Sequence, residues 1–146
     1  MGKISWNGVI LGGILAGIII DVVEYVLHGV VLNAHWRQAM QDLDRPLQET
    51  VGSMVFYVLL GVAYGIVAIW LYAAIRPRYG AGPKTALEAG FGVWLLGYLL
   101  PAVSWVPMGL FPGHLVTIAL VVGLGEILLA TLAGAWLYKE QEAASA

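Results

Sequence analysis

Residues 8–32 read GVILGGILAGIIIDVVEYVLHGVVL, an apolar run interrupted only by Asp21, Glu24 and His28. A helix needs about 20 mostly apolar residues to cross the hydrocarbon core of a bilayer. The run meets that length, and it is far longer than the roughly 7–15 apolar residues of a cleavable secretory signal. The sequence therefore predicts a retained membrane-spanning helix over residues 6–32.

Three further apolar runs follow, and they predict spans over about 52–75, 85–105 and 114–138. The chain has 146 residues, of which 60% are hydrophobic and 11% are charged, whereas soluble domains carry roughly 25% charged residues. Prolines in the intervening segments, such as Pro46, Pro77 and Pro83, are typical helix breaks. We expect an all-α integral membrane four-helix bundle, with residues 1–146 forming a single four-span transmembrane domain in contact with the lipid bilayer.

Composition also excludes several classes of function. A net charge of −2 argues against a nucleic-acid partner, because nucleic-acid binding requires a basic surface. The chain has no cysteine, which rules out disulfides and thiolate metal sites. No nucleophile–base arrangement can be assembled from the remaining residues, so the sequence does not predict an enzyme.

The positive charges predict the orientation of the spans. Short cytoplasmic loops carry an excess of lysine and arginine. One side of the predicted bundle holds Lys3, Arg76, Arg78, Lys84 and Lys139, and the other holds Arg37 and Arg45. We therefore expect both termini on the cytoplasmic side.

The first outer linker contains a short amphipathic pattern. Trp36, Met40 and Leu43 recur at helical spacing, which predicts an interfacial helix over about residues 35–43 on the outer surface.

A weak internal repeat suggests that the two hairpins are duplicated copies. Ala16-Gly17 precedes Tyr25 with the same spacing as Ala89-Gly90 precedes Tyr98, and the stretches 70–72 and 136–138 both read Trp-Leu-Tyr. Parallel repeats of this kind occur in transporter folds. Chance matches within an apolar alphabet are the alternative explanation.

Three polar residues of the first span share one side of the predicted helix. Asp21, Glu24 and His28, together with His35 beyond them, fall within a narrow sector at about 100° per residue. Glu126 lies at a similar depth in the fourth span, on a stripe of small residues that is typical of helix contacts in lipid. Tyr57 and Tyr64 share a face of the second span and are expected to point toward the same interior.

No lysine or arginine lies inside any predicted span, so these carboxylates lack a cationic partner. Three alternatives follow: the carboxyl groups are protonated, they hold a cation, or they line a wet cavity. As purely structural groups, they would be neutral acids that hydrogen-bond across helices. We favour a functional reading, in which a buried cluster of Asp21, Glu24, His28, Glu126, Tyr57 and Tyr64 binds or moves protons or a cation.

A divalent metal is one candidate cofactor, with Glu24, His28 and Glu126 as ligands, because carboxylate and imidazole suit such ions. The paired Glu-x-x-His pattern of di-iron bundles is absent. Haem ligation by His28 with His35 or His114 is disfavoured, because histidines at the outer edge of a bundle are usually solvated.

The alternative function is a non-catalytic accessory subunit. Three pairs of glycines at a spacing of four, Gly8–Gly12, Gly13–Gly17 and Gly61–Gly65, could dock a larger membrane complex or a second copy of the chain. The same pairs would serve internal packing equally well.

The stretches LYAAIRPRYGAGPKTA (residues 71–86) and GAWLYKE (residues 134–140) resemble a group of small four-span bacterial membrane proteins of unassigned function. The resemblance implies a bacterial inner-membrane protein and assigns no catalytic residue. Small multidrug transporters also have four short spans and a glutamate in the first, where this chain has Glu24, but the similarity ends there.

The charge asymmetry makes a testable prediction about orientation. Because the chain has no cysteine, single cysteines can be introduced at positions 3, 45, 76 and 139. We expect a membrane-impermeant thiol reagent, added outside intact cells, to label only position 45. Labelling of position 76 from outside would reverse the predicted orientation.

Overall fold

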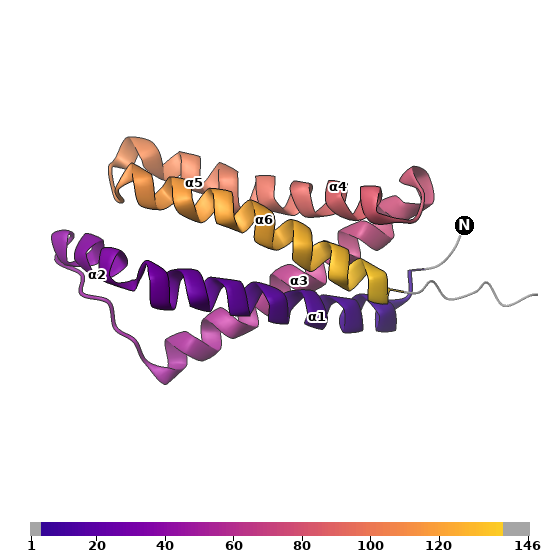
Figure 1. Cartoon of the computed structure of the whole chain (residues 1–146), viewed down its shortest axis with the longest axis horizontal. Helices are drawn as coiled ribbons and strands as arrows, with labels where there is room; N and C mark the ends of the chain where they lie inside the picture. Colours follow the sequence, from indigo (N-terminus) through magenta and orange to yellow (C-terminus); the bar gives the residue numbers. More distant parts are fainter. Residues whose placement is uncertain (1–3, 139–146) are drawn as a thin grey trace, which may run out of the picture.

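The computed structural model describes residues 4–138, which form an antiparallel bundle of helices (Figure 1). The elements in chain order are α1 (Trp6–Glu24), the π-helical segment η1 (Tyr25–Val31), α2 (Asn33–Asp42), α3 (Val51–Tyr79), α4 (Pro83–Trp94), the π-helical segment η2 (Leu95–Leu99), α5 (Leu100–Trp105), the 3₁₀ turn η3 (Val106–Met108) and α6 (Gly113–Leu137). Four of the helical stretches in this part of the chain, residues 6–31, 51–79, 83–108 and 113–137, are long and apolar enough to cross a membrane. The predicted all-α four-helix bundle is confirmed.

Local sequence signals set the helix ends. The Ser5 hydroxyl accepts a hydrogen bond from the amide of Gly8 and caps α1, and Thr50 and Ser53 form a reciprocal capping box at the start of α3, so both ends satisfy amides that lack helical partners. Pro83 occupies the first turn of α4, where its missing N–H costs nothing. The prediction that Pro77 terminates the second span was wrong. α3 continues to Tyr79, because a proline this near the end of a helix removes only one hydrogen bond.

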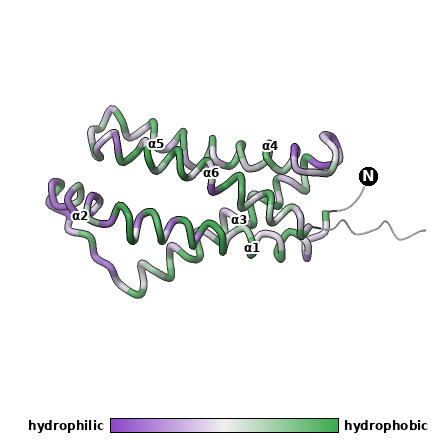
Figure 2. Tube along the Cα trace, in the orientation of Figure 1, coloured by the Kyte–Doolittle hydropathy of each residue, from purple (hydrophilic) through white to green (hydrophobic). Residues whose placement is uncertain are grey.

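The bundle is apolar on its outside as well as inside. Leu11, Ile18 and Val121 are more than half exposed. Hydrophobic residues predominate along the long helices, whereas α2 is mostly hydrophilic (Figure 2). Water would disfavour such a surface, and lipid would not. The surface thus indicates contact with a bilayer.

Glycines bring α1 and α3 into backbone contact. A Cβ atom on Gly65 would overlap the Gly13 carbonyl and the Gly17 amide, and one on Gly13 or Gly17 would overlap the backbone of Ile66 or Val62. Small residues at this spacing let two helices approach closely in lipid, where packing and not water exclusion drives association.

Glycines also bring α1 and α6 into backbone contact. A Cβ atom on Gly12 would lie 2.5 Å from the Gly134 carbonyl oxygen, and one on Gly134 would lie 2.5 Å from the Gly12 carbonyl oxygen. α1 is therefore the central helix of the bundle, pressed against α3 on one side and α6 on another.

The first half of α3 separates from α1. Residues 51–60 are exposed except for the half-buried Ser53, and Figure 1 shows α3 leaving α1 toward its N-terminal end. The separation begins next to Gly61, where the carboxyl of Asp21 occupies the space that a side chain would need. The C-terminal end of α1 is consequently uncovered on this side.

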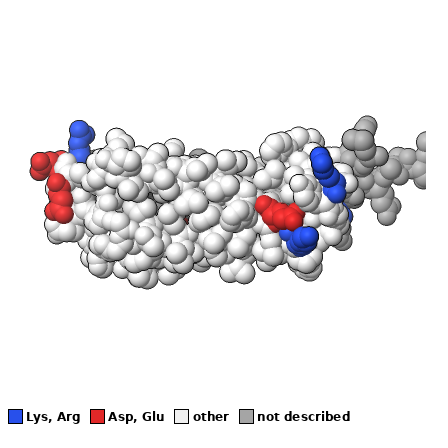
Figure 3. Space-filling model, turned by 90° about the horizontal axis from the view of Figure 1, so that it is seen from above, with Lys and Arg blue, Asp and Glu red and all other residues white. Residues whose placement is uncertain are grey.

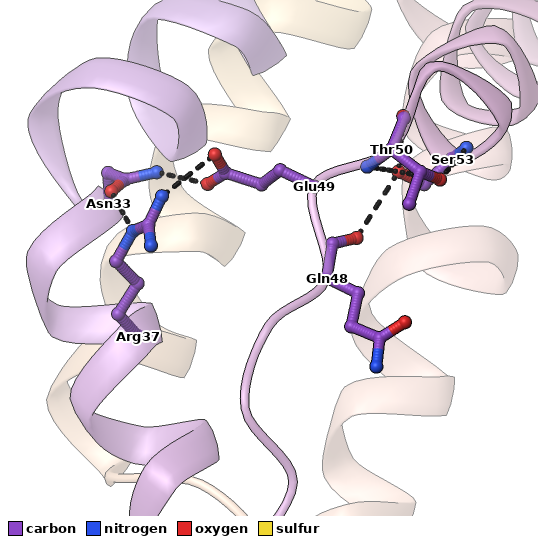
Figure 4. A network of polar contacts seen from close by, with 6 residues as sticks. All are labelled: Asn33, Arg37, Gln48, Glu49, Thr50 and Ser53. Atoms are coloured by element: carbon purple, nitrogen blue, oxygen red, sulfur yellow. Dashed lines mark hydrogen bonds and ion pairs between the residues drawn. The ribbon is translucent and has the colours of Figure 1, made fainter.

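α2 lies across the end of the bundle, close to the position predicted for the interfacial helix. Glu49, in the linker before α3, accepts a hydrogen bond from the Asn33 amide at 3.0 Å and pairs with the Arg37 guanidinium at 2.8 Å (Figure 4). Trp36 and Met40 are half-buried on the opposite face. The linker and the bundle therefore hold α2 from two sides.

Corresponding residues of the predicted repeat occupy similar places. Gly17 faces α3 and Gly90 faces α6, and a Cβ on either would lie 3.2 Å from a carbonyl oxygen of the facing helix. Tyr72 and Tyr138, which end the two Trp-Leu-Tyr stretches, are both buried, with their rings 5.9 Å apart. The duplication of the hairpins stays a prediction, and its other marker differs between the two copies: Tyr25 is 61% exposed, whereas Tyr98 is half-buried.

Charged side chains on the face shown in Figure 3 gather at the two ends of the long axis, with an uncharged band between them. The two ends of the described chain meet at one end of the bundle, where the Ser5 amide donates a hydrogen bond to the Tyr138 hydroxyl at 3.2 Å. A chain that crosses a membrane four times must begin and end on the same side. Which end faces the cytoplasm stays a prediction from the charges, and Lys3 and Lys139 lie outside the described residues.

The glycine contacts predict a contrast between two identical substitutions. Gly65→Ala places a methyl group against the backbone of α1 and should destabilise the bundle by about 1–3 kcal/mol. Gly125→Ala is the matched control, because no atom of the described residues lies within 4 Å of a Cβ there; it should be neutral or stabilise the helix by up to about 1 kcal/mol. Thermal unfolding in mild detergent measures both, and equal melting temperatures would contradict the packing.

Candidate functional site

Glu126 is the one buried acidic residue among residues 4–138, with 2% of its surface exposed. It projects from the middle of α6 beside the buried Gly123, Ile127 and Ala130, as the stripe of small residues predicts. No lysine or arginine occurs between residues 85 and 138. An ionised carboxylate near the centre of a bilayer costs about 3 kcal/mol even on lenient scales, so this environment favours the neutral acid.

Tyr98, in the π-helical segment η2, supplies the hydrogen bond to Glu126. Its hydroxyl donates to Glu126 Oε1 at 3.0 Å. Its ring also fills the space above Gly123, where a Cβ atom would come within 3.0 Å. The other oxygen, Glu126 Oε2, is buried and has no hydrogen-bond partner in the described part of the chain.

Glu24 lies close enough to Glu126 for the two carboxyl groups to interact. On its other side, Glu24 Oε2 is 3.3 Å from His28 Nε2. The Trp36 indole N–H donates to His28 Nδ1 at 2.8 Å. A continuous line of polar groups therefore runs from α2 at the end of the bundle, through η1 and α1, to Glu126 in the middle of α6.

Asp21 lies one turn before Glu24, beside Gly61 of α3. It is near enough for its charge to affect Glu126, but no hydrogen bond joins the two. Asp21 is thus an outlying member of the site.

The two predicted tyrosines differ in position. The Tyr64 hydroxyl donates to the Gly97 carbonyl at 3.2 Å, and its ring lies 5.3 Å from that of Tyr98, so Tyr64 borders the site. Tyr57 is 66% exposed and packs on Phe56. The expectation that Tyr57 reaches the interior was wrong, because α3 has left the bundle at that level.

The cluster is also less buried than the sequence predicts. The Glu24 side chain is 38% exposed and that of His28 is 28% exposed, and Asp21 is half-buried. The physical reason is the separation of α3, which leaves this side of α1 uncovered. Among the residues described, only Glu126 fits the expectation of a buried acid.

The metal prediction for Glu24, His28 and Glu126 is not supported. In residues 4–138, no group of three or more histidine or acidic side chains is arranged to hold a metal ion. Glu126 accepts a hydrogen bond from Tyr98, and His28 uses both ring nitrogens on Trp36 and Glu24.

His35 does not continue the line of polar groups. The sequence predicts it on the same side of one helix as Asp21, Glu24 and His28. The π-helical turns of η1 and the bend at Leu32 redirect the chain, so the His35 ring packs 6.4 Å from that of His114. Both rings are exposed.

A cavity of about 320 Å³ between α5 and α6 is lined by apolar groups such as Trp105 and Phe111 and contains none of the carboxylates.

Sequence reasoning missed two groups of this site. Tyr98 entered only as a marker of the repeat, and Trp36 only as part of an amphipathic pattern. The π-helical segments that direct Tyr98 and His28 have no signature in the sequence, although such segments are frequent at functional sites. Tyr98 could have been found, because it lies in the third span near the depth of Glu126.

Comparison of the chain with protein-family models, with curated proteins and with solved structures gives no match. The class of protein must therefore be inferred from the fold and the site alone. The chain is a candidate four-span membrane protein, a helical bundle in whose described residues one carboxyl group, that of Glu126, is buried.

The Tyr98 hydrogen bond makes a testable prediction. Tyr98→Phe keeps the ring against Gly123 but removes the donor to Glu126, and loss of a hydrogen bond to a buried acceptor should cost about 1–3 kcal/mol. Tyr57→Phe removes an exposed hydroxyl and should change stability by less than about 0.5 kcal/mol. Thermal or denaturant unfolding in detergent measures the difference, and equal losses would show that Tyr98 does not support Glu126.

Proposed function

We propose that the bundle binds and moves protons through Glu126, with Glu24 as its partner carboxyl. The observation that carries the proposal is a buried glutamate with one oxygen bonded to Tyr98 and the other without a hydrogen-bond partner among residues 4–138. A buried carboxyl group without a cation nearby is stable when protonated. Intramembrane ionisable groups of this kind commonly belong to proton relays.

Glu24 supports movement of the proton as well as its binding. Its carboxyl interacts with that of Glu126 and is itself partly exposed. A proton on Glu126 therefore has a second carboxyl group nearby that lies at the surface of the bundle. Two neighbouring carboxyl groups without a cation are most stable when they share one proton.

The accessory-subunit alternative depends on glycine-rich faces that are free to dock a partner. Gly12, Gly13, Gly17, Gly61 and Gly65 are instead occupied by contacts within the chain. This favours the proton-binding function. The resemblance noted in the sequence favours the bacterial inner membrane as its location.

The first test is chemical. A lipid-soluble carbodiimide reacts with protonated carboxyl groups in an apolar environment, and mass spectrometry locates the adduct. We expect modification at Glu126 at neutral pH, declining as the medium becomes alkaline and the carboxyl group ionises. Absence of modification at Glu126 in folded protein would contradict the proposal.

The second test is transport. Protein reconstituted in liposomes with an internal pH-sensitive dye should dissipate an imposed pH gradient, and Glu126→Gln should abolish that activity. Asp44→Asn is a matched control in the outer linker, at a positive φ of 54° that asparagine tolerates; it should behave as wild type. Equal rates for wild type and Glu126→Gln would exclude proton movement through this group.

A further inference from the structure

The hydrogen bond from Trp36 determines the protonation pattern of His28. The indole N–H can only donate, and it lies 2.8 Å from His28 Nδ1. Nδ1 must therefore present a lone pair, and the proton of the neutral imidazole resides on Nε2.

The proton on Nε2 faces Glu24. The Nε2 atom lies 3.3 Å from Glu24 Oε2, so the imidazole donates to the carboxyl group. A donated hydrogen bond favours the carboxylate form over the acid.

Glu126 has the opposite surroundings. It is 2% exposed, and the only hydrogen bond donated to it comes from the neutral hydroxyl of Tyr98 within the described residues. Of two interacting carboxyl groups that share one proton, the buried one should hold it.

We propose that Trp36 is a positioning residue for this carboxyl pair: by fixing His28 as a donor to Glu24, it assigns the shared proton to Glu126. The inference rests on the proposed function, because it specifies where the shared proton resides. It also couples the site to α2, which carries Trp36.

α2 is held in a way that suits this role. Glu49 binds Asn33 and Arg37 on one side of the helix (Figure 4). On the other side, the Trp36 ring lies 5.5 Å from that of Phe111 and 5.6 Å from that of His28. A displacement of α2 would therefore release His28 Nδ1 and redistribute the proton between the carboxyl groups.

The direct test is the tautomer of His28. The chain has three histidines, so ¹⁵N spectra of histidine-labelled protein are simple, and a His28→Gln sample assigns the signal. Wild type should show the Nε2–H form. Trp36→Phe keeps an aromatic ring at the position but removes the donor, and the preference for that form should fall roughly fivefold, as expected for one net hydrogen bond.

The second readout is the distribution of carbodiimide adducts between the two glutamates. Wild type should be modified at Glu126, whereas Trp36→Phe should gain modification at Glu24 by roughly the same factor of five. Trp105→Phe is the matched control, because Trp105 also packs on Phe111, at 6.2 Å, and has no part in the line of polar groups.

A further pair of variants tests the inference without altering Trp36. His28→Gln retains an amide donor for Glu24 and should keep the adduct on Glu126, whereas His28→Leu should shift it toward Glu24. Lack of adduct on both glutamates in wild type, with the Nε2–H tautomer present, would contradict the proposed function and leave the role of Trp36 in fixing His28 intact. A wild-type tautomer other than Nε2–H, or an unchanged adduct distribution in both Trp36→Phe and His28→Leu, would overturn the inference.

Discussion

A carboxyl group in the interior of an apolar bundle must be neutral, or a cation must compensate it, and Glu126 has no lysine or arginine near it in the sequence. Tyr98 and Glu24 are the polar groups that lie against it. Neither carries a positive charge that could compensate a carboxylate; Tyr98 donates a hydrogen bond to one oxygen of Glu126, and the Glu24 carboxyl group can share a proton with it. The rest of the site is arranged around this constraint, from the tyrosine of η2 to the histidine of η1.

Close helix packing creates the geometry that the carboxyl pair needs. Gly12 and Gly134 place α1 against α6, which brings Glu24 to Glu126, and Gly17 and Gly65 place α1 against α3. Beyond Gly61, α3 separates from α1, so the same helix that encloses one end of the site leaves the other open. Glu126 is enclosed and Glu24 is partly exposed because the glycine contacts between α1 and α3 do not continue beyond Gly61.

Much of this arrangement could be predicted from the sequence, and the reasons for the remainder are physical. Spans, the interfacial helix and the inward direction of Glu126 follow from hydrophobic runs and small-residue stripes. The exposure of Tyr57 does not, because periodicity identifies a face of a helix but not whether another helix covers it. The roles of Tyr98, His28 and Trp36 depend on the π-helical segments η1 and η2, which rotate side chains away from the positions of a regular helix.

The most direct measurement of the central claim, that Glu126 is a neutral acid inside the folded bundle, is infrared spectroscopy of the protein in lipid at neutral pH. A protonated carboxyl group has a carbonyl stretch distinct from the bands of a carboxylate. We expect this band in wild type, with a shift on hydrogen–deuterium exchange, and its loss in Glu126→Gln but not in Asp44→Asn. A wild-type spectrum with only ionised carboxylates would contradict the account.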